Sequence, residues 1–496
     1  MSSALVINVV PLRTNGALQQ VMLVLETPSP MIDVPADGIN LVASADQQPF
    51  ASLMKEPFSR QVIKDCGDAL FESLDTMPRF HKTDLTTAVR TPIYFKLDSP
   101  PAENLPWEAL WHRGRGVFVA LEKNWPLARL ATANSRPAAS LIEPELKILI
   151  VLAASCGDGP VPVDATGEWN AIWTALSKAP CASRLRVHVL SCQDTILETI
   201  AGLVNPPLKI TCEQLASEQT LQQTLAVLSP NIVHFFCHGS TDGDEPRLNL
   251  ATRGDYDAEL PTGRVWLGLN ELSPLGRSPS AWLVTLNCCQ GAQAAGRRSS
   301  IAAKIAATVP TVVAMRESVD FRKASLFAGA FYDHLLRALD QYIPSEADGA
   351  AAREFTIPES VWVDAMHPPR QILSNAGGED PAWTLPVVYV QRGELMMKAQ
   401  PRSASMFSLL PETDQNKITG LRMGVDQLRK MLATMKNTNA PASAAQDLEA
   451  PLAAVLRQAD EAERDALIVY VQTPDLPEWH VKMAQERLDD LQTRLA

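Results

Sequence analysis

Two short segments combine strand-forming residues with side chains that can act as a base and a nucleophile. They read Asn231-Ile-Val-His-Phe-Phe-Cys-His238-Gly239 and Ala281-Trp-Leu-Val-Thr-Leu-Asn-Cys-Cys289-Gln290-Gly291. Each run of apolar and β-prone residues predicts a strand of a parallel sheet that is buried on both faces. Catalytic groups of open α/β sheets lie beyond the carboxyl ends of the strands. We therefore expect His238 and Cys289 at one sheet edge, where the histidine could take the proton of a nucleophilic thiol.

Strand and helix patterns alternate around these two segments. Further strands are predicted at 146–152, 185–191, 208–212 and 311–316. Helices are predicted at 167–178, 194–204, 218–228, 299–308 and 320–339. This alternation indicates right-handed βαβ units, and therefore an α/β fold with a mostly parallel sheet flanked by helices. Residues 240–280, rich in Asp, Gly, Pro and Arg, form a long insertion suited to shaping a substrate cleft, and residues 340–380 are predicted as loops.

The two ends of the chain have different patterns from this core. A hairpin over 4–26, a helix over 60–75 and further strands over 92–131 indicate a β-rich N-terminal part. Helices are predicted over 412–436 and 442–496, with a break at Pro474 to Pro477. We therefore predict three parts, which are an N-terminal accessory lobe (1–142), a catalytic core (143–396) and a helical C-terminal region (397–496).

Composition narrows the class of protein. The net charge of −12 disfavours nonspecific binding to the phosphate backbone, so direct contact with nucleic acid is not expected. The sequence has no run of eighteen apolar residues, so a membrane-spanning helix is not expected. The N-terminus lacks the basic residues of a signal peptide. The eight cysteines have no regular spacing and several lie in apolar runs, which is typical of buried free thiols in a reducing cytoplasm.

The cysteine segment resembles the local signature of caspases, Q-A-C-[RQG]-G with a histidine about 50 residues upstream. Here the stretch is Asn287-Cys-Cys-Gln-Gly291, and His238 stands 51 positions before Cys289. The first two positions depart from the caspase string, and the chain resembles more closely the CHAT family of caspase-like and separase-like cysteine peptidases. Three further stretches resemble segments of that family in the same order, namely Leu105–Leu110 with its Pro-Trp-Glu, Val312–Asp320 and Trp383–Tyr389.

The resemblance implies a caspase-like cysteine endopeptidase that forms a thioester with its substrate. It implies that His238 is the base, that Cys289 is the nucleophile and that the backbone N–H groups of Gly239 and Cys289 form the oxyanion hole. No acidic third member of a triad, no cofactor and no metal are implied. Asn287 corresponds to a position that helps line the pocket for the residue before the cut, and its neutral side chain favours an uncharged residue there.

The resemblance also implies partners, namely a protein substrate and a regulatory protein or signal, in a cytoplasmic setting and without a membrane partner. Many members of this family act in bacterial conflict and defence, so the resemblance implies an antiviral defence role here, and the helical C-terminal region is the candidate for regulation or assembly. Two other functions stay open, which are a catalytically silent adaptor that binds partner proteins and a cysteine acyltransferase or peptide ligase.

The sequence does not favour a zinc site formed by His234, Cys237, Cys288 and a fourth ligand, because no paired C-x-x-C spacing supports it. Glu108 is expected to pair locally where the N-terminal lobe packs on the sheet.

Overall fold

The structure is a computed structural model of the 496-residue chain. The residues that it describes are 4–14, 17–26, 39–40, 60–75, 90–97, 99–132, 140–156, 163, 165–240, 245–277, 280–289, 291–293, 299–344, 354–377, 380–399, 410–437, 442–473 and 478–495. Gln290 of the cysteine segment lies outside them. The described chain forms two compact units, Met1–Pro401 and Arg402–Ala496, which are treated separately below.

The first unit is built on a sheet of twelve described strands. Their order is β11-β10-β9-β12-β16-β17-β19-β7-β4-β1-β2-β3. The six strands at one end are β9 (Leu146–Leu152), β10 (Leu185–Ser191), β11 (Lys209–Gln214), β12 (Ile232–Phe236), β16 (Leu283–Leu286) and β17 (Thr311–Met315). All neighbours among these six are parallel. The predicted fold class, an α/β fold with a mostly parallel sheet, is confirmed.

The order of these six strands creates a switch point between β9 and β12. From β9 the chain proceeds outward to β10 and β11, and it then returns to β12 and proceeds in the opposite direction to β16 and β17. Ligands of open α/β sheets bind beyond the carboxyl ends of strands at such a point. The strands that precede His238 and Cys289 are β12 and β16, so both residues follow strands at or beside the switch point.

Strands of the N-terminal part extend the same sheet. They are β1 (Leu5–Thr14), β2 (Ala17–Glu26), β3 (Ile39–Asn40), β4 (Ile93–Leu97) and β7 (Leu127–Ala131), and β19 (Pro386–Gln391) joins them to β17. β17 and β19 are antiparallel, whereas β19, β7, β4 and β1 are parallel to one another. The predicted hairpin is the antiparallel pair β1 and β2.

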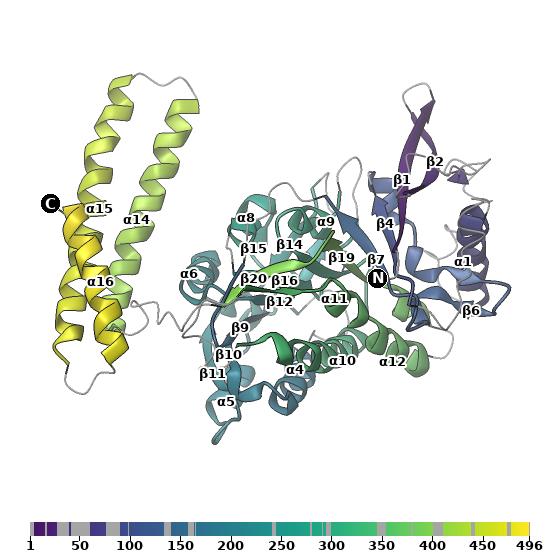
Figure 1. Cartoon of the computed structure of the whole chain (residues 1–496), viewed down its shortest axis with the longest axis horizontal. Helices are drawn as coiled ribbons and strands as arrows, with labels where there is room; N and C mark the ends of the chain where they lie inside the picture. The colour runs from purple at the N-terminus through teal and green to yellow at the C-terminus, as the bar shows by residue number, and fades with distance from the viewer. Residues whose placement is uncertain are drawn as a thin grey trace. The chain divides into compact units, whose positions relative to one another are not determined.

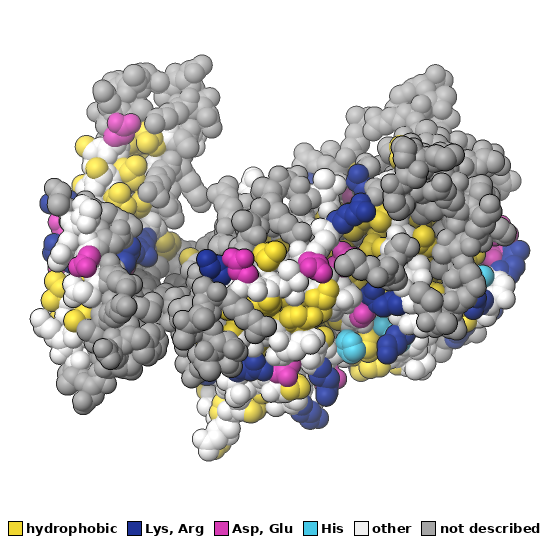
Figure 2. All heavy atoms as spheres, in the orientation of Figure 1, with side chains coloured by type: hydrophobic (Ala, Val, Ile, Leu, Met, Phe, Trp, Pro, Cys, Tyr) yellow, Lys and Arg dark blue, Asp and Glu magenta, His cyan; other side chains and the backbone are white. Residues whose placement is uncertain are grey.

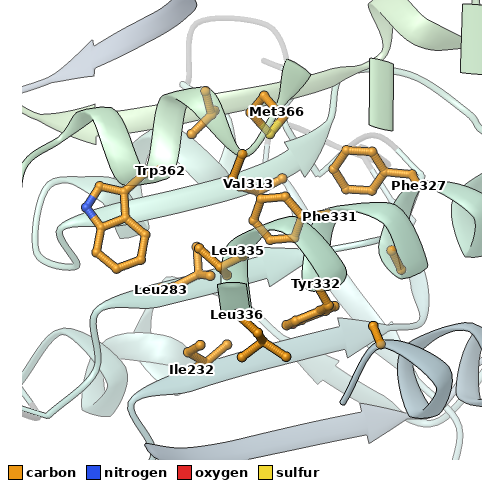
Figure 3. Close-up of a cluster of buried hydrophobic side chains, with 14 of the residues drawn as sticks. Ile232, Leu283, Val313, Phe327, Phe331, Tyr332, Leu335, Leu336, Trp362 and Met366 are labelled. Atoms are coloured by element: carbon orange, nitrogen blue, oxygen red, sulfur yellow. The ribbon is translucent and has the colours of Figure 1, made fainter. Parts of the chain in front are cut away.

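Helices cover both faces of the core sheet (Figure 1). On one face lie α4 (Thr166–Lys178), α5 (Asp194–Ala201), α10 (Phe321–Leu339), α11 (Ser360–Asp364) and α12 (His367–Gly377). On the other lie α6 (Glu218–Leu228), α8 (Leu269–Arg277) and α9 (Ile301–Ala306). Figure 3 shows how Phe331, Tyr332 and Leu335 of α10 pack against Ile232, Leu283 and other strand residues.

Residues 340–380 correct the sequence prediction, which gave loops. They contain β18 (Glu354–Ile357), α11 and α12. The sequence of α12 begins His367-Pro-Pro369, and proline normally argues against a helix. In the first turn, however, proline loses no intrahelical hydrogen bond and its backbone angle already suits the helix. The prolines of α12 therefore begin the helix rather than prevent it.

Smaller elements complete the first unit. They are α1 (Arg60–Asp75), α3 (Pro100–Asn104), β5 (Trp111–His112), β6 (Val117–Phe118), β8 (Ser140–Ile142), β13 (His238–Ser240), β14 (Arg247–Leu250), α7 (Arg253–Asp257), β15 (Val265–Leu267) and β20 (Leu395–Ala399). The 240–280 insertion contributes β14 and β15 to a small antiparallel sheet with β13, whose first residue is His238. The insertion thus packs directly beside the candidate base.

The second unit is helical, and its helices are α14 (Glu412–Asn437), α15 (Ala442–Val471) and α16 (Glu478–Leu495). Its core includes Ile418, Leu467 and Leu488, one from each helix. Glu463 of α15 is buried and pairs with Arg422 of α14 and Arg487 of α16, so one carboxylate joins all three helices. Among the described helices of both units, none combines the length and the apolar composition that a membrane span requires.

Candidate active site

His238 is half-buried at the carboxyl end of β12. Its Nε2 lies 3.2 Å from the backbone carbonyl oxygen of Ser155. A carbonyl oxygen can only accept a hydrogen bond, so this contact requires the proton on Nε2. Nδ1 is then the unprotonated nitrogen of the neutral ring, and it is the atom that can take a proton from a neighbouring thiol.

Ser155 belongs to the segment that follows β9, the strand next to β12. The two strands stay in register to their ends, where the Ala153 backbone N–H donates to the Phe236 carbonyl at 2.8 Å. The Ser155 hydroxyl donates to the Pro261 carbonyl at 2.8 Å and is buried, so the insertion fixes this segment from its other side. Sequence reasoning missed Ser155, because a backbone acceptor leaves no signature in the residue type.

Cys289 is half-buried beyond the end of β16, beside the start of α10. Its Sγ lies 3.9 Å from the Val319 carbonyl oxygen, one residue before the N-cap of that helix. Burial raises the pKa of the Cys289 thiol, although hydrogen bonds from the Val319 backbone and the Ser318 side chain act in the opposite direction. A raised pKa disfavours the thiolate, which is the nucleophilic form, so a neighbouring base is needed to generate it.

Gly239 and Cys289 are in direct backbone contact. A Cβ on Gly239 would lie 1.8 Å from the Cys289 carbonyl oxygen, far closer than any real carbon–oxygen contact. Only glycine fits this position without moving one of the two segments. The structure thus brings together His238, Gly239 and Cys289, three of the four site residues predicted from the sequence. Among the described residues, no hydrogen bond joins the His238 ring to the Cys289 sulfur.

The fourth predicted residue, Asn287, points into the interior and is 1% exposed. Its Nδ2 donates to Glu168 Oε1 at 2.6 Å and to the Ala324 carbonyl at 3.0 Å. Glu168 is also fully buried and lies 3.0 Å from His234 Nε2. Sequence reasoning gave His234 a core position and did not identify Glu168, whose only signal was its place at the start of an amphipathic helix.

The cysteines that precede the two candidate catalytic residues form a buried pair. Cys237 and Cys288 are both free and buried in the apolar cluster on the α6–α8–α9 face. A hydrogen bond to the Cys237 sulfur, together with burial, raises the pKa of the Cys288 thiol. His234 contacts Glu168 and Tyr332 on the opposite face, so the sheet separates it from both thiols. Among the described residues, no cluster of three or more His, Cys, Asp or Glu side chains could hold a metal.

Glu108 of the Pro-Trp-Glu stretch is at the centre of a second buried group of charges. It receives two hydrogen bonds from Arg129, at 3.1 and 2.8 Å, and both side chains are almost completely buried. Burial alone would raise the pKa of the Glu108 carboxyl, but Arg129, with Arg370 and Arg316, lowers that pKa below its usual value. Glu108 therefore neutralises a set of buried arginines where the N-terminal strands meet the core, and it does not touch the candidate dyad.

Comparison with known proteins identifies a matching family. A family model described as the CHAT domain matches residues 64–356, which is more than half of the chain. A search of curated proteins finds no match. A solved structure of the Saccharomyces cerevisiae separase–securin complex aligns with a TM-score of 0.31 at 11% identity. That alignment covers 75% of this chain and 21% of the other, so the chain spans about a fifth of that protein's length.

Proposed function

Because the chain belongs to the CHAT domain family, we propose that it is a caspase-like cysteine endopeptidase that cleaves a partner protein. The observation that supports this proposal is that the ends of three neighbouring strands meet at the same edge of the sheet. A base, a carbonyl that orients it and a thiol follow β12, β9 and β16, which are neighbours in the sheet. This is the minimum set for nucleophilic catalysis by cysteine, in which a third group orients the base.

In the proposed reaction, the Cys289 thiol gives its proton to His238 Nδ1 as the sulfur attacks the carbonyl carbon of the scissile amide. The Gly239 and Cys289 backbone N–H groups are proposed to hold the oxyanion of the tetrahedral intermediate. His238 then protonates the leaving amine, and a thioester remains on Cys289. Water attacks the thioester with His238 as base, which releases the acid and restores the thiol.

The His238 ring and the Cys289 sulfur contact separate backbone carbonyls and not each other, which supports a regulated enzyme rather than one that is always active. A substrate or activator would have to bring the His238 ring and the sulfur into hydrogen-bonding contact before the thiolate forms. The same observation is what favours the second candidate, a catalytically silent adaptor that keeps the fold and binds partner proteins. Labelling of the thiol distinguishes the two candidates.

Asn287 remains our proposal for a residue that influences the pocket for the substrate side chain just before the scissile bond. Its Nδ2 is already held by Glu168 and Ala324, whereas its Oδ1 has no hydrogen-bond partner among the described residues. The whole amide, including Oδ1, is buried, so its effect on the residue before the cut would be indirect, through the shape of the site. Because the Asn287 side chain is neutral, we propose that an uncharged side chain is preferred before the cut.

The proposed partners are a protein substrate and a regulatory protein, and the proposed setting is a bacterial antiviral defence system in the cytoplasm. Figure 2 shows acidic and basic side chains interspersed over the described part of one face. This mixed distribution and the net charge of −12 support a protein partner over nucleic acid. The unit Arg402–Ala496 is proposed to regulate or recruit, so its removal should change control more than the intrinsic chemistry.

The test is covalent labelling with four peptidyl chloromethyl ketones that differ only in the last residue, which is Leu, Gln, Lys or Glu. Labelling of Cys289, mapped by mass spectrometry and abolished in Cys289→Ala and His238→Ala, supports the peptidase. The matched control is Cys212→Ala, which removes another half-buried thiol and should leave labelling intact. Labelling that persists in Cys289→Ala, or that never occurs with cell extract present as a source of activator, favours the adaptor.

A further inference from the structure

Three buried polar side chains lie beneath the candidate nucleophile, on the face of the sheet that α4 and α10 cover. Glu168 comes from the first turn of α4, His234 from β12 and Asn287 from the end of β16. Glu168 is 0% exposed, and its Oε1 lies 2.6 Å from Asn287 Nδ2 and 3.0 Å from His234 Nε2. One carboxylate oxygen therefore meets the strand that leads to the base and the strand that leads to the nucleophile.

The contacts of Asn287 fix its orientation completely. A carboxylate and a carbonyl only accept hydrogen bonds, so both N–H groups of the amide face Glu168 and Ala324. Its backbone N–H donates to the Phe235 carbonyl at 2.9 Å, which ties it to β12 as well. Asn287 is thus held by α4, α10 and β12, and Cys289 follows only two residues later.

The start of α10 contacts both ends of this short segment. Ala324, in its first turn, accepts from Asn287, and Val319, just before the helix, contacts the Cys289 sulfur. The helices α4 and α10 are packed closely enough that a Cβ on Gly329 would lie 3.2 Å from Ala171 Cβ. Glu168 therefore stands on a helix that is itself fixed against the helix start that faces the nucleophile.

We propose that Glu168 is a positioning residue of the candidate site. Through the Asn287 amide it holds the end of β16, and Cys289 with it, against the start of α10. This inference rests on the proposed peptidase function for its kinetic consequences. Its structural consequence, a change in how Cys289 is held, does not depend on that function.

The test compares Glu168→Leu with Glu168→Gln, which keeps an acceptor oxygen in place. The matched control is Glu145→Leu, which removes another buried carboxylate, one that pairs with Arg186 and Lys209 at the start of β9, on the opposite edge of the sheet. Because a displacement of about 1 Å can cost 10²-fold in rate, we expect Glu168→Leu to lower kcat by about 10–100-fold while KM stays within about twofold. Glu168→Gln should retain most of the rate.

Alkylation of Cys289 by iodoacetamide gives the readout that needs no substrate. Released from its position, the sulfur should react at least about threefold faster in Glu168→Leu, and at the native rate in Glu168→Gln and Glu145→Leu. Melting temperatures, measured alongside, establish that all variants are folded at the assay temperature. Equal alkylation rates in Glu168→Leu and Glu145→Leu, or loss of kcat in Glu168→Gln as large as in Glu168→Leu, would overturn the inference. If the native chain has no turnover and no peptidyl labelling, the peptidase proposal fails. The alkylation series would still decide whether Glu168 positions Cys289.

Discussion

Replacing Glu108 with glutamine should destabilise the first unit strongly, because it leaves buried arginines without their carboxylate. Arg129 is almost completely buried and would keep its contacts with the Glu103 and Leu105 carbonyls and with the Tyr389 hydroxyl, but would lose its ion pair. Removing one partner of a buried ion pair costs about 3–5 kcal/mol. The unit contains about 400 residues, so its entropy of unfolding at about 2.1 cal/mol/K per residue is about 0.8 kcal/mol/K. Glu108→Gln should therefore lower Tm by about 4–6 °C.

The matched control is Glu72→Gln, which makes the same chemical change at an exposed pair with Arg113. An exposed pair is worth about 0–1 kcal/mol, so Tm should fall by about 1 °C or less. Both variants would be compared with the native chain by scanning calorimetry at pH 7. Equal shifts in Tm for the two variants would refute the assignment of Glu108 to a buried ion pair that stabilises the fold.

The loss of stability in Glu108→Gln should depend on pH. The pKa of the Glu108 carboxyl is lower in the folded state than in the unfolded chain. Its ionisation therefore stabilises the fold above the unfolded pKa of about 4.3, and this stabilisation is lost as the pH falls through the folded value. The Tm difference between the native chain and Glu108→Gln should be constant from pH 7 to about 5 and should shrink in more acidic solution. A difference that stays constant into acid would contradict the lowered pKa.

Four further predictions follow, three for the candidate site and one for the second unit. Native-state titration with a thiol reagent should modify Cys289 and Cys212 before the buried cysteines, and Cys289→Ala should remove one of the two fast-reacting thiols. Because burial raises the pKa of the Cys289 thiol, its alkylation rate should continue to rise above pH 9, and a plateau below pH 8 would contradict this. Gly239→Ala should abolish labelling of Cys289, since its Cβ would meet a carbonyl oxygen at 1.8 Å, whereas Gly254→Ala, with its nearest neighbour at 4.0 Å, should retain it. Gly420→Ala, in open space on α14, should stabilise the second unit by about 0.5–1 kcal/mol in urea denaturation.

Periodicity in the sequence predicted the alternating strands and helices of the parallel sheet, but not β18, α11 and α12. The strand before Cys289 and the helix after β17 were predicted within one or two residues, because apolar spacing reports burial on a sheet or along a helix face. The alternation of side chains along β12 and β16 also indicates which residues share a face. His234 and Asn287 both point toward α4 and α10, whereas Cys237 and Cys288 point away from them.

The partners of the candidate site could not be predicted in the same way. Ser155 lies 83 residues before His238, and Glu168 lies 119 residues before Asn287. A pattern in a single sequence indicates that a polar side chain faces the interior, but not which distant group it meets there. Ser155 contributes only a backbone carbonyl, which any residue type could supply. The sequence therefore identifies a candidate base and a candidate nucleophile, and the structure adds the groups that contact and hold them.

The central claim is that the Cys289 thiol and the His238 ring act together on a peptide carbonyl. A crystal structure of the adduct with the best-labelling peptidyl chloromethyl ketone tests it most directly. We predict a bond from Cys289 Sγ to the inhibitor, with the ketone oxygen about 2.7–3.1 Å from the backbone N–H groups of Gly239 and Cys289. His238 should keep Nε2 on the Ser155 carbonyl and turn Nδ1 toward the adduct. An adduct on another cysteine, or a His238 ring with Nδ1 directed away from the sulfur, would contradict the account.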